Sequence, residues 1–256
     1  SGGEPILGGF GLSDGAITKT EVGYPVGSFF LYDSMGIFQS QEEIDQAPYQ
    51  TKDTRPGDIR FRDINGDNKI DQNDRTHAGS PFPKLTYGCN ISVNWKNFDV
   101  STLFQGVYGN DLYFLYGNFA YETQSRGFNS YDDVKNYWSP TNTDTDIPKV
   151  SLDDRNGNRR VSTRFLYAGN YLKMRNFTLG YNFKPMIKSN KINTLRMYVT
   201  GQNLFTWTRY PGLDPEIQAN NNDTSGVGIS SDFAVGIDWG TVPAPRTIIF
   251  GINLTF

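Results

Sequence analysis

One stretch of the chain has side chains spaced for binding a hard cation. The segment DINGDNKIDQND, residues 63–74, contains oxygen-bearing side chains at Asp63, Asn65, Asp67, Asp71 and Asp74. Counted from Asp63, these are places one, three, five, nine and twelve of a calcium loop, and the carbonyl of Lys69 stands at place seven. Alternate side chains in a tight turn converge on one point, so the spacing predicts calcium binding by these six residues.

Two departures from the calcium-loop pattern indicate weakened binding. Asn68 replaces the glycine of the sharp turn, and Asp74 replaces the glutamate that binds calcium through both oxygens. Asparagine tolerates a positive φ, so neither departure forbids the ion. The alternative is an Asp/Asn turn whose side chains bind their own backbone.

Enzymatic chemistry finds little support. With one histidine, His77, and one cysteine, Cys89, both a zinc site of the usual ligands and a Cys–His catalytic pair are poorly supported. Cys89 is better explained as a small hydrophobic residue on a strand. The adjacent carboxylates at 132–133 and 153–154 could serve glycoside hydrolysis, but adjacency does not set the separation that this reaction needs. We therefore predict that the protein is not an enzyme.

Aromatic side chains gather in segments that lack strand patterning. Such rings beside Asp, Asn and Arg suit stacking on sugars or contact with a partner protein, while packing within the loops is the alternative for any single ring. The candidates for substrate or partner contact are Tyr113, Tyr116, Tyr137, Trp138, Trp207, Tyr210 and Trp239.

Composition narrows the protein class. The 256-residue chain is 14% aromatic and contains no run of about 18 apolar residues, so a membrane-spanning helix is not expected. A net charge of −3 offers no basic stripe for nucleic acid. No signal-peptide pattern opens the chain, so either the protein is cytosolic or the sequence is a mature or partial product of a longer protein, and the strand count below favours the second.

Five segments alternate apolar and polar residues, as two-faced strands do. They are Leu85 to Trp95, a strand beginning at Phe98, Tyr171 to Phe183, a strand beginning at Leu195, and Arg246 to Phe256. Their polar faces should line a lumen through Asn90, Ser92, Asn94, Asp99, Gln105, Asn176, Thr178 and Gln202. Residues 1–24 are expected to be loop with at most one short strand, and 26–38 strand material.

The connections between these strands alternate short and long. The turn at 96–97 and the connection at 184–193 are short, while about 109–170 and 209–245 are long. Outer-membrane barrels have this asymmetry, with short turns on the periplasmic side. Five strands and about two more near the start cannot close a barrel, since about eight is the usual minimum. We therefore predict an all-β fold in which residues 1–256 are part of a larger antiparallel transmembrane β-barrel.

Several phrases resemble the C-terminal region of SusC-like TonB-dependent outer-membrane transporters. They are PGDIRFRDINGDNKIDQNDR, SPFPKLTYGCNISVNWKNFDVSTLFQGVYGND, YLKMRNFTLGYNF, GQNLFTWTRYPGLDPEI and DWGTVPAPRTIIFGINLTF. The resemblance implies a barrel of about 22 strands with an N-terminal plug that this sequence lacks. It also implies TonB-energised import of oligosaccharides or peptides across the Gram-negative outer membrane, with a SusD-like surface lipoprotein as lid.

The end of the chain also resembles the signal read by the barrel-assembly machinery, at Gly251, Leu254 and Phe256. Ile249 stands where that signal usually has a polar residue. Two rival interpretations remain at this point. One is a secreted or surface-attached calcium-bearing β-sandwich that binds glycans without transporting them, and the other is a surface glycanase.

Overall fold

The chain folds into two compact units. The computed structural model describes residues 3–9, 15–121, 129–187, 192–217 and 234–256. The sheet unit comprises Pro83–Asn110, Ala168–Pro215 and Val242–Phe256, and the loop unit comprises Ser1–Phe82, Asp111–Tyr167 and Glu216–Thr241. Much of the two segments that the sequence predicts as long loops therefore belongs to a unit with its own core.

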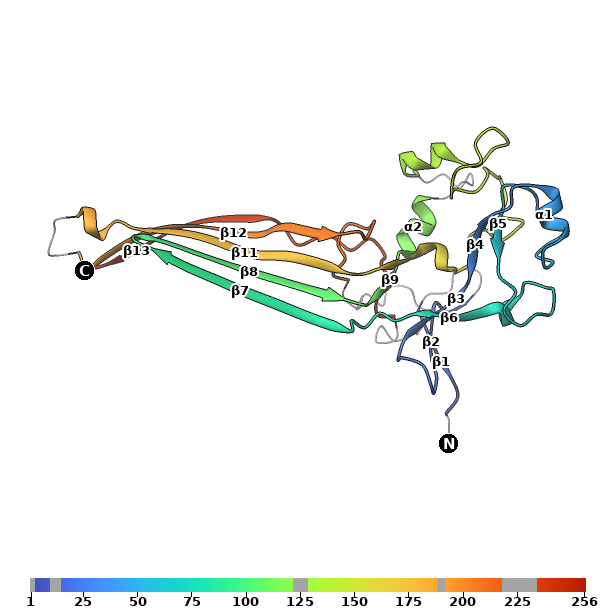
Figure 1. The fold of residues 1–256 in the computed structure, drawn as a ribbon, viewed down its shortest axis with the longest axis horizontal. Coiled ribbons are helices and arrows are strands. Elements are labelled where there is room, and N and C mark those ends of the chain that lie inside the picture. The colour runs from blue at the N-terminus through green and yellow to red at the C-terminus, as the bar shows by residue number, and fades with distance from the viewer. Residues whose placement is uncertain (1–2, 10–14, 122–128, 188–191, 218–233) are drawn as a thin grey trace. The chain divides into compact units, whose positions relative to one another are not determined.

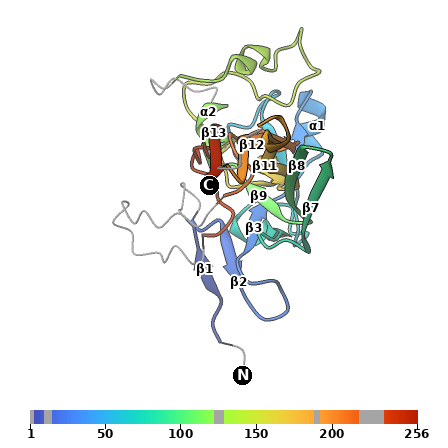
Figure 2. The same cartoon turned by 90° about the vertical axis from the view of Figure 1, so that its left-hand side faces the viewer.

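The sheet unit is built on a five-stranded antiparallel sheet in the order β13-β12-β11-β8-β7. Figure 1 shows its strands running side by side, and Figure 2, which views them from one end, shows β7 and β13 at opposite edges. A 3₁₀ turn, η4 (Lys184–Met186), follows β11. The strands are β7 (Leu85–Trp95), β8 (Phe98–Tyr108), β11 (Tyr171–Asn182), β12 (Thr194–Thr208) and β13 (Thr247–Thr255).

These strands confirm the predicted alternation. β7 has the predicted bounds, and β8, β11 and β13 differ from the predicted ends by at most a few residues. The pairs Trp95↔Phe98, Asn182↔Arg196 and Thr194↔Thr255 place both short connections and the end of β13 at the same end of the sheet. β12 is longer than the pattern indicates, because it continues through FTWT to Thr208.

One irregularity in β11 decides which side chains face which way. Met174 pairs with Phe104 and Asn176 with Leu103, so Arg175 is an extra residue relative to β8. Such a bulge reverses the alternation on one side of it. Arg175 and Lys173 consequently lie on the polar face, although unbroken alternation from Phe177 assigns them to the apolar face.

In its described residues the loop unit contains short elements only. A four-stranded sheet has the order β1-β2-β3-β6, β4 pairs with β5, and β9 pairs with β10. Its strands are β1 (Ile6–Gly8), β2 (Thr18–Thr20), β3 (Ser28–Tyr32), β4 (Ser34–Ile37), β5 (Ile59–Phe61), β6 (Arg75–Gly79), β9 (Asp111–Tyr113) and β10 (Leu166–Ala168), the last reaching the unit boundary. Its helices are α1 (Gln41–Asp45) and α2 (Leu115–Ala120), with 3₁₀ turns η1 (Gln72–Asp74), η2 (Asp132–Asn136) and η3 (Thr163–Phe165).

The N-terminal part differs from the sequence prediction. Residues 1–24 contain two short strands instead of at most one, and β3 and β4 pair within the loop unit rather than extending the five-stranded sheet. Residues after Ser40 form the helix α1, whose first turn is capped by the Ser40 hydroxyl accepting from the Glu43 N–H.

Two apolar clusters hold the loop unit together. The larger is formed by Ile17, Phe29, Leu31, Tyr113, Leu115, Val161, Phe165 and Ile237, and the smaller by Tyr32, Ile59, Phe61 and Ile70. The larger cluster joins segments that are more than 200 residues apart in the chain. Among the described residues, none of the helices has both the length and the apolar character needed to cross a membrane.

Candidate functional site

The sheet unit has one continuous apolar face. Side chains of alternate residues on all of its strands share this face, and at the edges they are largely exposed: Phe250 is 82% exposed, Ile248 64%, Trp95 63% and Ile91 47%. A row of this kind is far larger than the apolar patches that a protein normally leaves to water. Cys89 is exposed on the same face, paired with Phe104, as expected for a small hydrophobic residue.

The opposite face is polar and contains all of the residues predicted to line a lumen. In the observed register Asn94 pairs with Asp99, Thr178 with Ser101 and Thr200, and Asn176 with Gln202. The Thr178 and Thr200 hydroxyls are 2.8 Å apart. The sequence pattern thus assigns the faces correctly wherever the alternation is unbroken.

An ion pair spans β11 on this polar face. Arg196 Nε and Nη2 donate to the two carboxylate oxygens of Asp99 at 2.8 and 2.5 Å. Gly180 lies between them, and a Cβ there would stand 2.5 Å from Asp99 Oδ1 and from Arg196 Nη2. Only glycine at 180 leaves the two charged groups room to meet.

Two further glycines accommodate tyrosine rings from the neighbouring strand. A Cβ at Gly251 would lie 2.2 Å from Tyr198 Cζ, so the ring crosses β13 at that point. On the apolar face a Cβ at Gly106 would lie 2.5 Å from Tyr87 Cζ, and the Tyr87 hydroxyl donates to the Tyr171 carbonyl at 3.2 Å. Gly251, one of the predicted assembly-signal residues, therefore has a packing role of its own.

A buried ion pair joins β11 to the connection after β12. Lys173 Nζ donates to both carboxylate oxygens of Asp214 at 2.6 and 2.9 Å, and the two side chains are 4% and 9% exposed. Because both groups are removed from water, removing either partner would leave the other as an unpaired buried polar group. The sequence pattern does not predict this pair, because the bulge at Arg175 moves Lys173 from the face that unbroken alternation assigns to it.

The residues of the predicted calcium loop lie together in one turn, and their carboxylates accept bonds from the loop itself. Asp63 accepts from the N–H groups of Gly66 and Asn68 at 2.6 and 2.8 Å, and Asp67 accepts from Lys69 N–H at 2.9 Å. Asn68 has the positive φ, 65°, that this position of the turn requires. The alternative interpretation, an Asp/Asn turn bound to its own backbone, therefore describes this geometry.

The last residue of this loop is its most buried carboxylate. Asp74 is 0% exposed and accepts from Ile64 N–H at 2.9 Å and Asp71 N–H at 2.7 Å. Asp71 accepts from Asn73 N–H at 2.9 Å and from Lys69 Nζ at 3.1 Å. Within the described part of the chain, no group of three or more His, Cys, Asp or Glu side chains is arranged to hold a metal ion.

Hydrogen bonds lower the pKa values of two carboxyl groups in the 63–74 loop. Burial raises the pKa of Asp63, but the N–H donors of Gly66 and Asn68 outweigh it, and the net pKa is below its ordinary value. The Asn73 N–H and the Lys69 ammonium lower the pKa of Asp71. Stabilisation by these carboxylates is therefore present above their ordinary pKa and is lost as the pH falls through the lowered values.

Three of the seven predicted contact rings are buried. Tyr113 is 0% exposed within the larger apolar cluster, Tyr210 is 5% exposed, and Trp138 is 7% exposed with its Nε1 donating to Gln39 Oε1 at 2.7 Å. Rings enclosed in this way contribute packing and cannot contact a substrate or partner without rearrangement. We therefore reassign these three residues to the interior of their units.

Trp207 is also reassigned, because it lies in a strand instead of a loop. It pairs with Leu172 on the apolar face of the sheet and stacks on Phe205, with ring centroids 5.8 Å apart. Its 49% exposed ring therefore extends the apolar face. Aromatic residues at the ends of such faces are typical of membrane interfaces.

The remaining three rings are available for contact. Tyr116 is 45% exposed, Tyr137 41% and Trp239 39%, all in the loop unit. Tyr116 lies 6.3 Å from the ring of Tyr131, and Trp239 lies 6.4 Å from Phe119. The structure thus adds Tyr131, which is 36% exposed, to the aromatic surface that the sequence predicts, while Phe119 is partly buried against the larger apolar cluster.

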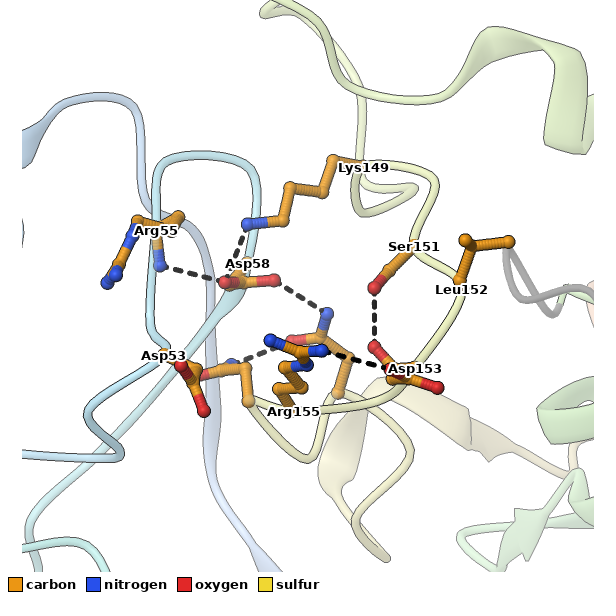
Figure 3. A pocket seen from close by; sticks show the side chains of 10 residues that line it. Asp53, Arg55, Asp58, Lys149, Ser151, Leu152, Asp153 and Arg155 are labelled. Carbon is orange, nitrogen blue, oxygen red and sulfur yellow. Dashed lines mark hydrogen bonds and ion pairs between the residues drawn. The ribbon is translucent and has the colours of Figure 1, made fainter.

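A cavity of about 360 Å³ in the loop unit is lined mainly by charged groups (Figure 3). Lys149 Nζ donates to Asp58 Oδ2 at 2.9 Å, and the Asn158 amide donates to Asp58 Oδ1 at 3.0 Å. Asp58 is 3% exposed. These groups form hydrogen bonds and an ion pair with one another, and they connect residues 50–61 to residues 154–158. The charged side chains of the cavity wall therefore stabilise the fold.

Three of the four carboxylates considered for hydrolysis pair with neighbouring groups. Asp154 accepts from the N–H groups of Asn158 and Arg159 at 2.6 and 3.0 Å, while Asp153 pairs with Arg155 at 3.3 Å. Asp132 pairs with Lys135 on the surface. None of these arrangements sets two carboxylates across a substrate, as glycoside hydrolysis requires.

The single histidine lies between a serine and a glutamate. His77 Nδ1 is 2.5 Å from Ser28 Oγ, and His77 Nε2 is 2.7 Å from Glu21 Oε1. Ser28 is only 1% exposed and its hydroxyl donates to the Lys19 carbonyl at 3.1 Å. A nucleophile needs access to a substrate, so this chain of contacts is best explained as packing between β3 and β6.

Comparison with known proteins finds TonB-dependent receptors that are similar to this chain over most of its length. No protein-family model matches it. It is 34% identical over 236 residues to TonB-dependent receptor P3 of Formosa agariphila, covering 91% of this chain and 22% of that protein. It is 32% identical to TonB-dependent receptor P26 of the same organism, covering 93% of this chain and 23% of the relative. With TonB-dependent receptor SusC of Bacteroides thetaiotaomicron the identity is 26%, over 96% of this chain and 21% of the relative.

Solved structures agree on the fold. The structure of the RagAB peptide transporter matches with a TM-score of 0.70 and 21% identity, covering 94% of this chain and 24% of that one. The RagAB peptide importer in its open-open state matches with a TM-score of 0.68 and 22% identity, over 96% and 24%. The β-sandwich and glycanase alternatives are therefore rejected. The chain spans about a fifth of the length of its curated relatives, and over most of its own length it is similar to a segment of SusC-like TonB-dependent receptors, which are β-barrel proteins of the outer membrane.

Proposed function

We propose that the receptor containing this chain imports nutrient oligosaccharides or peptides across the outer membrane, energised by TonB and assisted by a SusD-like surface lipoprotein. The observation that carries this proposal is the sheet with one exposed apolar face and one polar face, which suits a barrel wall between lipid and a wet lumen. The named relatives support the same class of activity.

Within that function the two units have different tasks. The apolar face of the sheet unit contacts outer-membrane lipid, and its polar face lines the lumen. The exposed rings of the loop unit, at Tyr116, Tyr137 and Trp239, contact the substrate or the lipoprotein lid. Aromatic rings offer a large contact area to either partner.

Growth and uptake measurements test the function directly. Cells that lack the receptor gene should fail to accumulate a labelled oligosaccharide or peptide that the parent strain imports, and cells that lack TonB should fail in the same way. Complementation with the full-length gene should restore uptake in the first strain only. Uptake that survives the loss of TonB would contradict energised import.

The assembly signal at Gly251, Leu254 and Phe256 remains a prediction, and Gly251 offers a way to separate it from packing. Gly251→Ala should force the Tyr198 ring aside and cost about 1–3 kcal/mol, because a Cβ would lie 2.2 Å from Tyr198 Cζ. Combined with Tyr198→Ala, the same substitution should cost little if packing is the whole effect.

The readouts are the unfolding midpoint in detergent and the amount of folded receptor in the outer membrane. An assembly role predicts that Gly251→Ala lowers the folded amount in both backgrounds. Equal amounts of Tyr198→Ala and of the double variant would remove Gly251 from the signal.

Calcium binding by the 63–74 loop also remains a proposal, supported by the spacing of its oxygen atoms. We expect added calcium to raise the unfolding midpoint of the full-length receptor relative to chelator, and Asp63→Ala and Asp67→Ala to remove that shift. Asp153→Ala is the matched control, because Asp153 is an exposed carboxylate in the same unit. If wild type has the same midpoint in calcium and in chelator, only the backbone-bonded turn remains.

A further inference from the structure

The loop unit contains a second cavity that none of the predicted site residues lines. Its volume is about 260 Å³, below the roughly 300–1,000 Å³ of pockets that enclose a whole small ligand. It therefore suits one end of a larger ligand. The lining residues are Tyr121, Asp133, Asn136, Asp146, Ile147, Arg164, Phe165 and Tyr167.

The cavity lining is apolar where it is buried and charged where it is exposed. Ile147 and Phe165 are buried, Tyr121, Arg164 and Tyr167 are half-buried, and the two aspartates are exposed. A site of this kind holds a ligand by apolar contact at its closed end and by a few polar groups that fix orientation. The polar groups here are one guanidinium, two phenol groups and two carboxylates.

Arg164 stands out because its guanidinium makes no ion pair or hydrogen bond with any described residue. The guanidinium packs over the Phe165 ring, 5.0 Å from its centroid. By contrast, Arg62, Arg155 and Arg196 each pair with an aspartate. Arginine stays charged in proteins, so Arg164 keeps several donors in a half-buried position beside an open cavity.

The surroundings leave this charge partly uncompensated. Burial lowers the pKa of the Arg164 guanidinium, and the carboxylate of Asp146 acts in the opposite direction. Burial also raises the pKa values of the Tyr121 and Tyr167 phenols, which keeps both hydroxyls neutral at physiological pH. The cavity thus offers one planar cation beside neutral hydroxyl groups.

The charges select the class of ligand. A guanidinium fork matches a carboxylate through two parallel hydrogen bonds. The two exposed aspartates give the lining more negative than positive charge, which disfavours an acidic oligosaccharide and favours a ligand that also carries an ammonium group. A neutral oligosaccharide would add no carboxylate that could form an ion pair with Arg164.

We propose that this cavity binds the carboxylate end of a short zwitterionic peptide, with Arg164 holding the carboxylate and Asp133 and Asp146 attracting the ammonium group. The proposal rests on the import function proposed above and names a substrate class for it. Tyr121 and Tyr167 frame the terminal residue, and Ile147 and Phe165 contact its apolar part.

Calorimetric titration of the full-length receptor in detergent tests this assignment. The probes are tri-alanine, its C-terminal amide, cellotriose and trigalacturonate. We expect tri-alanine to bind and the amide to bind about 10- to 100-fold more weakly, the range for losing a charge-assisted hydrogen bond. Equal binding of acid and amide, no binding of tri-alanine, or tighter binding of either sugar would overturn the proposal.

Variants separate Arg164 from general effects. Arg164→Gln should weaken tri-alanine binding to the level of the amide and abolish the difference between the two, whereas Arg164→Lys should retain part of it. Arg155→Gln is the matched control, because Arg155 is a surface arginine of the same unit paired only across a 3.3 Å contact with Asp153. If Arg164→Gln binds like Arg155→Gln at an unchanged unfolding midpoint, Arg164 is not the carboxylate site.

This binding measurement needs no TonB and no lipoprotein. A receptor that binds tri-alanine through Arg164 but supports no uptake would contradict the import function and leave the site intact. A receptor that supports uptake but discriminates neither carboxylate nor amide would contradict the site alone.

Discussion

Replacing Lys173 with methionine should destabilise the receptor by about 3–5 kcal/mol, the largest effect expected of any single substitution considered for this chain. The substitution leaves the Asp214 carboxylate, which is 9% exposed, without the ammonium that donates to both of its oxygens. An uncompensated buried charge must be hydrated or protonated, and either change loosens the connection that follows β12. Unfolding in detergent, monitored by denaturant titration, measures the loss.

The double variant Lys173→Met with Asp214→Leu is the informative companion. Replacing both charges with apolar groups of similar size is commonly neutral or stabilising, so most of the lost stability should return. Lys135→Met is the surface control, because Lys135 and Asp132 are 81% and 83% exposed and such pairs contribute about 0–1 kcal/mol. A Lys173→Met variant as stable as the Lys135→Met variant would show that the ion pair is dispensable.

An arginine at Ile91 should destabilise the barrel by about 2–4 kcal/mol, as charged residues do on the lipid face near the bilayer midplane. Ile91 is near the middle of β7, is 47% exposed, and pairs with Thr102 on the apolar face. Its charge would have to enter hydrocarbon or distort the strand. The measurement is the unfolding free energy of the receptor in lipid vesicles, not in detergent alone.

The adjacent residue supplies the control. Ser92 pairs with Ser101 on the polar face, so Ser92→Arg meets water in the lumen and should change stability by less than about 1 kcal/mol. If the two substitutions cost the same, or if Ser92→Arg is the costlier, the assignment of the faces is reversed or the sheet does not contact lipid.

The sequence predicted the sheet unit well because each strand there carries a complete pattern. In β7, Leu85 to Trp95 alternate without interruption, and the two residues between Trp95 and Phe98 set the hairpin. Local alternation suffices when one face is apolar throughout and the connection is tight.

The loop unit could not be predicted in the same way. Its core unites Ile17, Tyr113 and Ile237: Ile17 precedes the three-residue strand β2, Tyr113 ends the three-residue strand β9, and Ile237 forms an isolated bridge with Tyr113, so none of them belongs to a periodic pattern. Burial there depends on contacts between distant parts of the chain. Tyr113 and Trp138 consequently looked like exposed loop rings, and their packing against residues such as Gly57, where a Cβ would lie 2.4 Å from Trp138 Cε3, left no local trace in the sequence.

The candidate sites differ in the same way: the sequence predicts those made of consecutive residues and misses those that depend on tertiary structure. The Asp63 to Asp74 turn was found because its residues are consecutive, and the structure shows it as a turn. Lys173 was missed because one bulge at Arg175 moves it to the other face. Arg164 was missed because its cavity partners, Tyr121 and Asp146, come from separate segments.

The glycine that admits the Tyr198 ring also bears on how the strands find their alignment. A slip of β13 by one residue would exchange its faces and is opposed by the apolar pattern, but a slip by two residues preserves that pattern. In the observed register Tyr198 pairs with Gly251. A two-residue slip would bring Ile249 or Asn253 under the ring, and either side chain would collide with it. The Tyr198 ring fits only over a residue without a side chain, so its contact with Gly251 selects one register of β13 among those that the apolar pattern alone would allow.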